Sequence, residues 1–212
     1  MSSFGFNFRQ LAGYVTDPTG TAFVTTSNTY PTTVSVDSID YVVGWNYKGG
    51  GAAGSSRNRT STQDPRLAGM VQQREAPAVF AIELPTSGVY AVRLAFGDAF
   101  SKTIRAKIYD DETLIATVAD NLGVSGGEFA DALGNVYTYA TWPTENQPLE
   151  LNFTSGIFAL QICANNVPHG TSIDDAIAHI SLEAVTQTPL PPINPSVSNL
   201  LATSARLNWE QG

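Results

Sequence analysis

Residues 79–96, VFAIELPTSGVYAVRLAF, decide the fold class of this chain. Val79–Leu84 and Val89–Phe96 each alternate with the period of two that predicts a half-buried β-strand. Pro85 ends the first run and Thr86-Ser87-Gly88 has the composition of a turn, so the two runs are expected to pair as a hairpin. The predicted buried face of the second run consists of Tyr90, Val92, Leu94 and Phe96.

Short segments of the same character continue to residue 185, separated by turn signals. Such segments, with about 8–12 residues from turn to turn, are typical of an all-β sandwich or barrel. Leu149–Phe153 and Ile157–Ala164 are also expected to pair, because Thr154-Ser155-Gly156 separates them as a turn. The one weak helical signal is Pro65–Val71, with Asp64 as its N-cap. The remaining predicted strands are Thr103–Tyr109, Leu114–Val118, Tyr137–Trp142 and Ala176–Val185.

A proline-rich stretch divides the chain near its end. Residues 187–195 are rich in proline, which predicts a stiff, extended linker. We therefore expect a β-sandwich domain at residues 1–186 and a separate segment at residues 196–212. That last segment is too short to bury a core of its own.

The composition excludes several classes of protein. The formal net charge of the 212 residues is −8, and an acidic chain is a poor overall partner for nucleic acid. The single cysteine, Cys163, rules out an internal disulfide framework and a zinc site built from several thiolates. No apolar run approaches the ~20 residues of a membrane span, and the start lacks the pattern of a secretory signal. We therefore expect neither nucleic-acid binding nor membrane insertion.

The charge is spread unevenly along the chain. Five basic residues and one acid lie between Lys48 and Arg74, whereas twelve acids and one base follow Ile108. One interpretation is that these charges only keep the protein soluble. The sharper interpretation is that the basic loop faces a polar protein partner or a sugar.

Motifs for catalysis are incomplete. The Gly-rich stretch Gly49–Gly54 lacks the Gly-Lys-Ser/Thr ending of a phosphate-binding loop. The Gly97-Asp98 pair follows a strand as in some esterases, but Ala99 stands where the nucleophilic serine is needed. No Gly-x-Ser-x-Gly elbow is present, and we interpret His179 as a structural strand residue and His169 as a loop residue. These patterns predict a protein without catalytic activity.

Two candidate binding sites remain. Aromatic rings stack on the apolar face of a sugar, and arginines donate paired hydrogen bonds, which makes Trp45, Tyr47, Arg57 and Arg59 candidate glycan ligands. Trp142 is a further candidate platform, although core packing is the usual fate of tryptophan. Calcium prefers several oxygen ligands, so the adjacent Asp174 and Asp175 are candidate calcium ligands. Asp110-Asp111-Glu112 is interpreted as a solvated turn between strands.

Several motifs together resemble a known family. They are Phe6-Asn7-Phe8 at the opening, Gly44-Trp45 before an arginine-bearing loop, Asp64-Pro65-Arg66-Leu67, the run from Phe80 to Asp98, and Asp174-Asp175-Ala176-Ile177 at the close. Residues 4–185 resemble galactose-binding-like β-sandwiches, in particular the N-terminal modules of rhamnogalacturonan-esterase-type proteins. Asn7 stands where that family usually has Asp, and no glycine follows directly. The resemblance implies a jelly-roll sandwich that binds carbohydrate without catalysis.

The tail carries a second resemblance. Pro195 to Leu200 and Ser204 to Trp209 resemble the first two strands of a fibronectin type III domain, which needs about 100 residues. A sandwich, a proline-rich linker and a fibronectin-like start together resemble phage virion proteins. This implies a virion structural protein, either a tail-associated attachment module or a head decoration. Its partners would be other virion proteins, copies of itself and a cell-surface glycan.

Two alternatives stay open. The first is a carbohydrate-binding module of a polysaccharide-degrading protein, secreted or on the cell surface. The second is a hydrolase whose nucleophile carries no recognisable motif.

Overall fold

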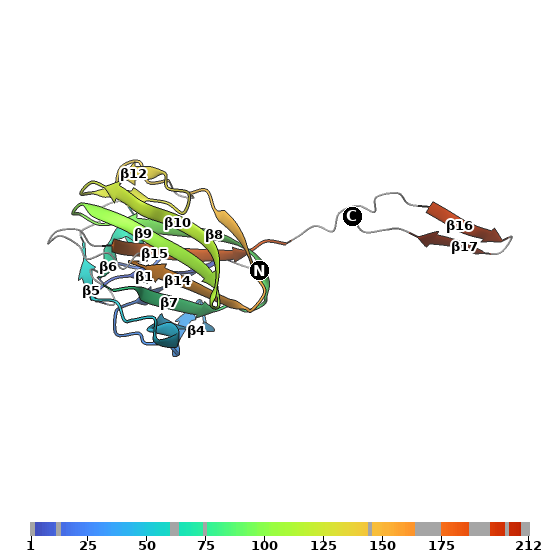
Figure 1. Ribbon diagram of the computed structural model, residues 1–212, viewed down its shortest axis with the longest axis horizontal. Coiled ribbons are helices and arrows are strands. Elements are labelled where there is room, and N and C mark those ends of the chain that lie inside the picture. Colours follow the sequence, from blue (N-terminus) through green and yellow to red (C-terminus); the bar gives the residue numbers. More distant parts are fainter. Residues whose placement is uncertain are drawn as a thin grey trace.

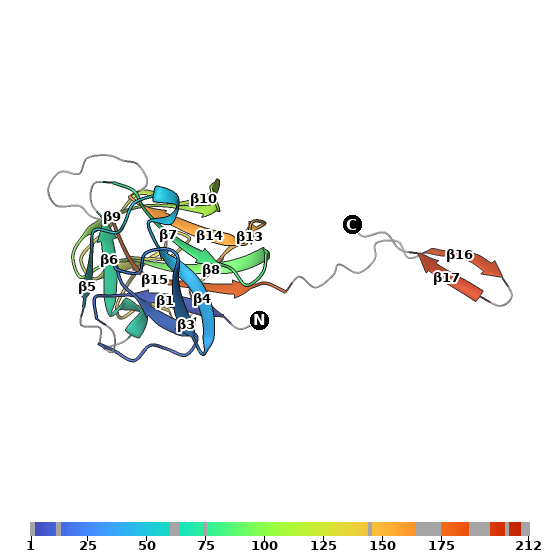
Figure 2. The ribbon, with the colours of Figure 1, turned by 90° about the horizontal axis from the view of Figure 1, so that it is seen from below.

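The computed structural model describes residues 3–11, 14–59, 64–73, 76–143, 146–163, 175–186, 196–201 and 204–208. Two sheets lie face to face and form a jelly-roll β-sandwich (Figures 1 and 2). The expectation of an all-β sandwich is therefore confirmed. Among the described residues, no helix has the length and apolar character needed to cross a bilayer. The predicted linker at residues 187–195 lies outside the described residues.

The larger sheet has nine strands among the described residues. Its central strand, β15, pairs with β1, β6 and β8, all antiparallel, whereas β2 adds to β1 in parallel. The nine strands are β1 (Phe4–Phe8), β2 (Thr21–Val24), β5 (Ser55–Asn58), β6 (Gly69–Gln73), β8 (Gly88–Gly97), β11 (Glu128–Ala130), β12 (Val136–Thr138), β13 (Leu149–Phe153) and β15 (Asp175–Ala184).

The smaller sheet has six described strands in the order β10-β9-β14-β7-β4-β3. They are β3 (Thr32–Val36), β4 (Ile39–Trp45), β7 (Ala78–Glu83), β9 (Lys102–Asp110), β10 (Thr113–Val124) and β14 (Ile157–Ile162). Two short 3₁₀ helices, η1 (Tyr47–Gly49) and η2 (Pro65–Leu67), complete the sandwich domain in its described part. In the tail, β16 (Ser196–Leu201) and β17 (Ser204–Asn208) pair with each other as a two-stranded sheet.

The two predicted hairpins are wrong. β7 belongs to the six-stranded sheet and β8 to the nine-stranded sheet, so the turn after Leu84 carries the chain across the sandwich. β13 and β14 are divided in the same way, since β13 pairs with β8 and β14 with β7 and β9. Alternation shows which face of a strand is buried, but both sheets bury one face against the same core. A local pattern therefore cannot tell a hairpin partner from a strand of the opposite sheet.

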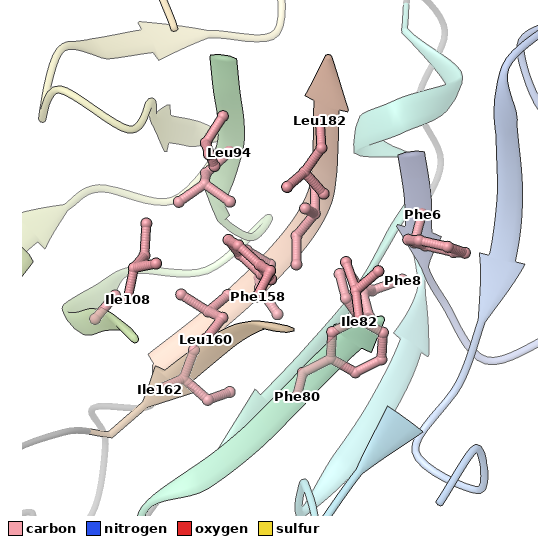
Figure 3. Packing of buried hydrophobic residues seen from close by; sticks show 14 of the residues in the cluster. Phe6, Phe8, Phe80, Ile82, Leu94, Ile108, Phe158, Leu160, Ile162 and Leu182 are labelled. Carbon is pink, nitrogen blue, oxygen red and sulfur yellow. The ribbon is translucent and has the colours of Figure 1, made fainter. Parts of the chain in front are cut away.

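The inward faces of both sheets meet in one core (Figure 3). β7 contributes Phe80 and Ile82, and the neighbouring β14 contributes Phe158 and Leu160. From the opposite sheet, the predicted buried face of β8 points into this core as expected. The core residues of β8 are Tyr90, Val92, Leu94 and Phe96.

Trp45 is part of this core. Its side chain has no exposed surface, and its ring lies 5.7 Å from the ring of Phe8 and 5.1 Å from that of Phe80. A ring packed in this way has no face to offer a sugar, so the prediction that Trp45 forms a sugar platform is wrong. The reason is its place in β4, where strand parity directs the side chain toward the opposite sheet.

We expect Trp45→Ala to lower the free energy of unfolding by about 3–5 kcal/mol, because the substitution leaves a large cavity in the core. Urea unfolding followed by far-UV circular dichroism measures this change. Phe100→Ala is the matched control, since the Phe100 side chain is 64% exposed. The Arg59 guanidinium lies 5.3 Å from the centre of the Phe100 ring, so the effect of Phe100→Ala should stay within about 1 kcal/mol. Equal unfolding midpoints for Trp45→Ala and the parent chain would contradict the assignment.

Candidate functional site

A cleft of about 610 Å³ lies on the outer face of the nine-stranded sheet. We call it the sheet cleft. Ile180 and Leu182 of β15 point into the core, so the alternate residues of the same strand point outward. These outward residues, His179, Ser181 and Glu183, line the cleft together with Arg93 of β8.

Three segments far apart in the sequence surround that floor. The first is residues 18–21, which lead into β2, and the second is Asp64 to Arg66 at η2. The third contains Tyr139 and Trp142, which follow β12. The predicted N-cap at Asp64 is confirmed, because its carboxylate accepts the backbone N–H of Arg66. The predicted helical turn is shorter than expected, since β6 begins at Gly69.

The aromatic wall stands on a small apolar cluster outside the main core. The Phe129 ring lies 4.9 Å from the ring of Tyr139 and 6.1 Å from that of Trp142. Tyr139 Oη and Trp142 Nε1 are buried and have no hydrogen-bond partner in the described part of the chain. An unpaired buried polar group costs about 1–3 kcal/mol. Both residues line the sheet cleft.

Asp64 and Arg66 form a rigid charged pair at one side of the cleft. Arg66 Nε donates to Asp64 Oδ1 at 2.9 Å, and Arg66 Nη2 donates to Asp64 Oδ2 at 2.5 Å. Burial disfavours the charged carboxylate, but the hydrogen bonds from Arg66 outweigh that effect and lower the pKa of Asp64. Within the described residues these bonds and one to the Pro143 carbonyl use only Nε and Nη2, so Nη1 is left for a ligand.

A second charged pair lies on the cleft floor. Arg93 Nη1 donates to Glu183 Oε2 at 3.2 Å, and Arg93 Nε donates to the carbonyl of Asn146 at 3.1 Å. Both side chains are orientated by these bonds, while Arg93 Nη2 makes no hydrogen bond within the described residues. The cleft thus presents two arginines that are each fixed by a carboxylate and each keep a donor nitrogen.

His179 is buried beneath these charges, which confirms its interpretation as a structural residue. Its Nδ1 lies 2.8 Å from Asn7 Oδ1, and Asn7 Nδ2 donates to Asp17 Oδ1 at 2.7 Å. Because the amide nitrogen of Asn7 faces Asp17, its oxygen accepts the Nδ1 proton of His179. Burial, together with the nearby Arg66 charge, lowers the pKa of His179 to about 3. The imidazole is therefore neutral at physiological pH.

The structure does not bring the predicted glycan ligands together. Tyr47 lies at a separate, smaller pocket beside Tyr109 and Gln161 of the six-stranded sheet. Arg57 is exposed on β5, whereas Arg59 binds the buried Asp98 through Nε at 2.6 Å and Nη2 at 3.1 Å. None of the four predicted residues lines the sheet cleft.

The predicted calcium ligands are described only in part. Asp174 lies outside the described residues. The carboxylate of Asp175 is buried and accepts hydrogen bonds from the backbone and the guanidinium of Arg105, with Nη2 at 2.8 Å. Among the described residues, no group of three or more His, Cys, Asp and Glu side chains is placed to hold a metal ion. Calcium binding stays a prediction, with Asp175 already engaged by an arginine.

The turn at Asp110-Asp111-Glu112 is confirmed between β9 and β10, but its first carboxylate is not solvated. Asp110 is buried and accepts hydrogen bonds from the backbone N–H groups of Thr154 and Ser155 and from their hydroxyls. It therefore anchors the segment between β13 and β14.

Solved structures with a similar fold include carbohydrate-binding modules. The match to a family 35 module from Paenibacillus barcinonensis covers 68% of this chain and 99% of the module, with 15% identity and a TM-score of 0.36. A family 35 module from Clostridium thermocellum matches over 60% of this chain and 84% of its own, with 12% identity and a TM-score of 0.33. A GH26-CBM35 β-(1,4)-mannanase from Podospora anserina matches over 74% of this chain and 30% of its own, with 14% identity and a TM-score of 0.35.

No protein-family model matches the chain, and no curated protein matches its sequence. Because these TM-scores are below 0.5, the structural similarity does not establish the function of this chain. The expected virion role, and the expected assembly with virion proteins or with further copies, draw no support from these neighbours and stay predictions.

Part of the sheet cleft carried a signal in the sequence. Asp64-Pro65-Arg66 belonged to a motif of the resemblance, and Trp142 stood before Pro143 as a candidate platform. Arg93 and Glu183 carried none, because each is one polar residue on the outward parity of a strand. Only the pairing of β8 with β15 makes them neighbours.

We expect Asp64→Asn to lower the free energy of unfolding at pH 7 by about 1.5–3 kcal/mol, since charge-assisted hydrogen bonds to Arg66 are lost. The folded state lowers the pKa of Asp64, so its stabilising effect is present above about pH 4 and is lost as the pH falls through the folded-state pKa. The gap between the parent chain and Asp64→Asn should therefore shrink at acidic pH. Urea unfolding at pH 7, 5 and 3 measures the gap.

The control for this experiment is Glu150→Gln, at an exposed position of β13. It should change stability by no more than about 0.5 kcal/mol at each pH. A gap for Asp64→Asn that stays constant from pH 7 to pH 3 would show that the carboxylate charge is not what holds Arg66.

Proposed function

We propose that this chain is a non-catalytic module that binds a carbohydrate in the sheet cleft. The observation that carries the proposal is the cleft itself, which combines an aromatic wall with two arginines held by carboxylates. Its volume of about 610 Å³ lies within the ~300–1,000 Å³ of ligand pockets.

The chemistry of the lining suits a polyhydroxylated ligand. Trp142 and Tyr139 supply apolar ring surface for the C–H face of a sugar. Arg66 Nη1 and Arg93 Nη2 supply N–H donors, while the Ser181 hydroxyl and the Glu183 carboxylate supply acceptors. The positive and negative charges of the lining are balanced pair by pair, which favours hydrogen bonding to a neutral ligand over attraction of an ion.

The same groups are poorly placed for acid–base chemistry. Asp64 and Glu183 are each paired with an arginine. Although burial acts in the opposite direction, the hydrogen bonds from Arg66 lower the pKa of Asp64, so this carboxyl has no proton to donate at physiological pH. His179 is held neutral, with Nδ1 bonded to Asn7. Catalytic acids and bases need pKa values matched to the working pH, and Asp64 and His179 depart from that requirement.

The structural neighbours reported above include modules named for carbohydrate binding, and the alternative from the sequence was a module of this class. A location outside the cell or at its surface would follow for such a module. The proposal rests on the cleft, and a glycan array probed with the full chain tests it. Running the array with calcium and again with EDTA also tests the calcium prediction.

We expect Trp142→Ala to weaken binding of an array-identified glycan by roughly 30-fold, equivalent to about 2 kcal/mol for a buried aromatic anchor. Isothermal titration calorimetry gives the dissociation constants. The matched control is Phe100→Ala, an exposed aromatic outside the cleft, which should bind like the parent chain.

A second variant in the sheet cleft distinguishes a loss of binding from a loss of folding. Glu183→Gln keeps the shape of a half-exposed side chain and removes only the charge that orientates Arg93. It should weaken binding while the urea midpoint stays close to that of the parent chain. Full affinity in both Trp142→Ala and Glu183→Gln would overturn the assignment of the cleft.

A further inference from the structure

A second hollow lies on the opposite face of the sandwich, outside the six-stranded sheet. Its volume is about 210 Å³, roughly a third of that of the sheet cleft, and the two share no residue. We call it the tyrosine hollow. Its main lining residues are Tyr47, Lys48, Tyr109, Asp111, Ala159 and Gln161.

Strand register explains why the surface is hollow there. Ala159 of β14 lies between Tyr109 of β9 and Ala81 of β7. The two small alanine side chains leave a depression beside the large side chain of Tyr109. Phe158 and Leu160 on either side point into the core, which directs Ala159 outward. Tyr47 approaches from η1, which packs on β7. The hollow therefore has an apolar floor and tyrosine rings at its edge.

Polar groups around the rim are held in place but not saturated. Tyr47 Oη and Lys48 Nζ both bond to Asp111 Oδ1, each at 2.6 Å. Within the described residues, Oδ2 of the same carboxylate accepts no hydrogen bond. Tyr109 Oη donates to Gln161 Oε1 at 2.9 Å, which leaves the Gln161 amide nitrogen as a donor. One acceptor and one donor thus face a space bordered by aromatic rings.

The charge state of these groups is stable at physiological pH. Burial and the hydrogen bond to Asp111 raise the pKa of Tyr47 to about 12, so its hydroxyl stays neutral. The hydrogen bond from Lys48 lowers the pKa of Asp111, with a further contribution from Tyr47. Asp111 is therefore a charged acceptor.

We propose that the tyrosine hollow is a second saccharide-binding site, which takes a single uncharged sugar ring. The ring would place its C–H face on the half-buried Tyr109, beside the buried Tyr47, and its hydroxyls on Asp111 Oδ2 and the Gln161 amide. This site goes beyond the proposed function, because it lies on the other sheet and works without the sheet cleft.

Charge distinguishes a sugar from an ionic ligand. Lys48 Nζ already lies 5.5 Å from the centre of the Tyr47 ring and is paired with Asp111 and Glu112. A ligand cation would have to displace this lysine. A ligand anion would meet two carboxylates against one ammonium group. A neutral polyol meets neither barrier and matches the free donor and acceptor.

Nuclear magnetic resonance titration of the full ¹⁵N-labelled chain tests the proposal. The probes are D-glucose, D-galactose and D-mannose, each added separately. Backbone amides of Asp111 and Gln161 report on the tyrosine hollow, whereas those of Arg66 and Ser181 report on the sheet cleft. We expect at least one hexose to shift the Asp111 and Gln161 amides in a saturable way.

Two variants identify the groups responsible. Gln161→Ala should weaken the hexose affinity at the tyrosine hollow by about tenfold or more, and Tyr109→Ala should abolish saturation there. Lys107→Ala is the matched control, because Lys107 pairs with Gln161 across β9 and β14 but does not line the hollow. Trp142→Ala should leave the Asp111 shifts unchanged.

The outcomes separate the two sites. Shifts confined to Arg66 and Ser181 would overturn the second site while supporting the sheet cleft. Saturable shifts at Asp111 together with an empty glycan array would support the hollow and contradict the proposed function of the cleft. The absence of saturable shifts at Asp111 and Gln161 with all three hexoses would overturn the inference, as would shifts that Gln161→Ala leaves unchanged.

Discussion

The antiparallel pairing of β1 with β15 is the contact on which the rest of the structure depends. It joins Asn7 to His179, which are 172 residues apart, and so closes the sandwich domain on itself. β15 also pairs with β6 and β8 and is therefore the centre of the nine-stranded sheet. Its inward side chains, Ile180 and Leu182, fill the core, while its outward side chains form the cleft floor. Closing a long loop loses chain entropy, and the buried contacts of β15 are what offset it.

A buried ion pair links this central strand to the opposite sheet. At the start of β15 the Asp175 carboxylate binds Arg105 of β9, which belongs to the opposite sheet. Removing two charges from water is unfavourable, and burial raises the pKa of Asp175. Arg105 counteracts this effect by donating to Oδ2 through Nε and Nη2 and to Oδ1 through its backbone N–H. Further along β15, the carboxylate of Glu183 binds Arg93. The carboxylate of Asp64 binds Arg66 in the same cleft. Arginines that are already orientated lose less entropy when a ligand binds, which is the physical basis of preorganisation in the cleft.

The tryptophans show how place in a sheet decides the role of a residue. Both Trp45 and Trp142 follow strand-like sequence, and both were candidate sugar platforms. Trp45 ends β4 with its ring against Phe8 and Phe80, so it stabilises the sandwich. Trp142 follows β12 beyond the sheet, with its ring in a T-shaped contact with Phe129 and part of its surface in the cleft. Neither outcome was visible in composition, because both depend on which layer of the sandwich a side chain meets.

By itself the sequence predicted eight strands between residues 79 and 185 and the buried face of β8, because alternation is a local property of the chain. It did not predict β2 to β6 or β11, which are shorter or alternate less regularly. It also indicated Asp64, Arg66 and Trp142, each through a short motif or a residue type. Only the tertiary structure decided that β7 and β8 belong to different sheets, and that Arg93 and Glu183 meet beneath the aromatic wall. Those contacts join residues far apart in the chain. Side-chain periodicity records the direction in which a residue points but not the strand that lies beside it.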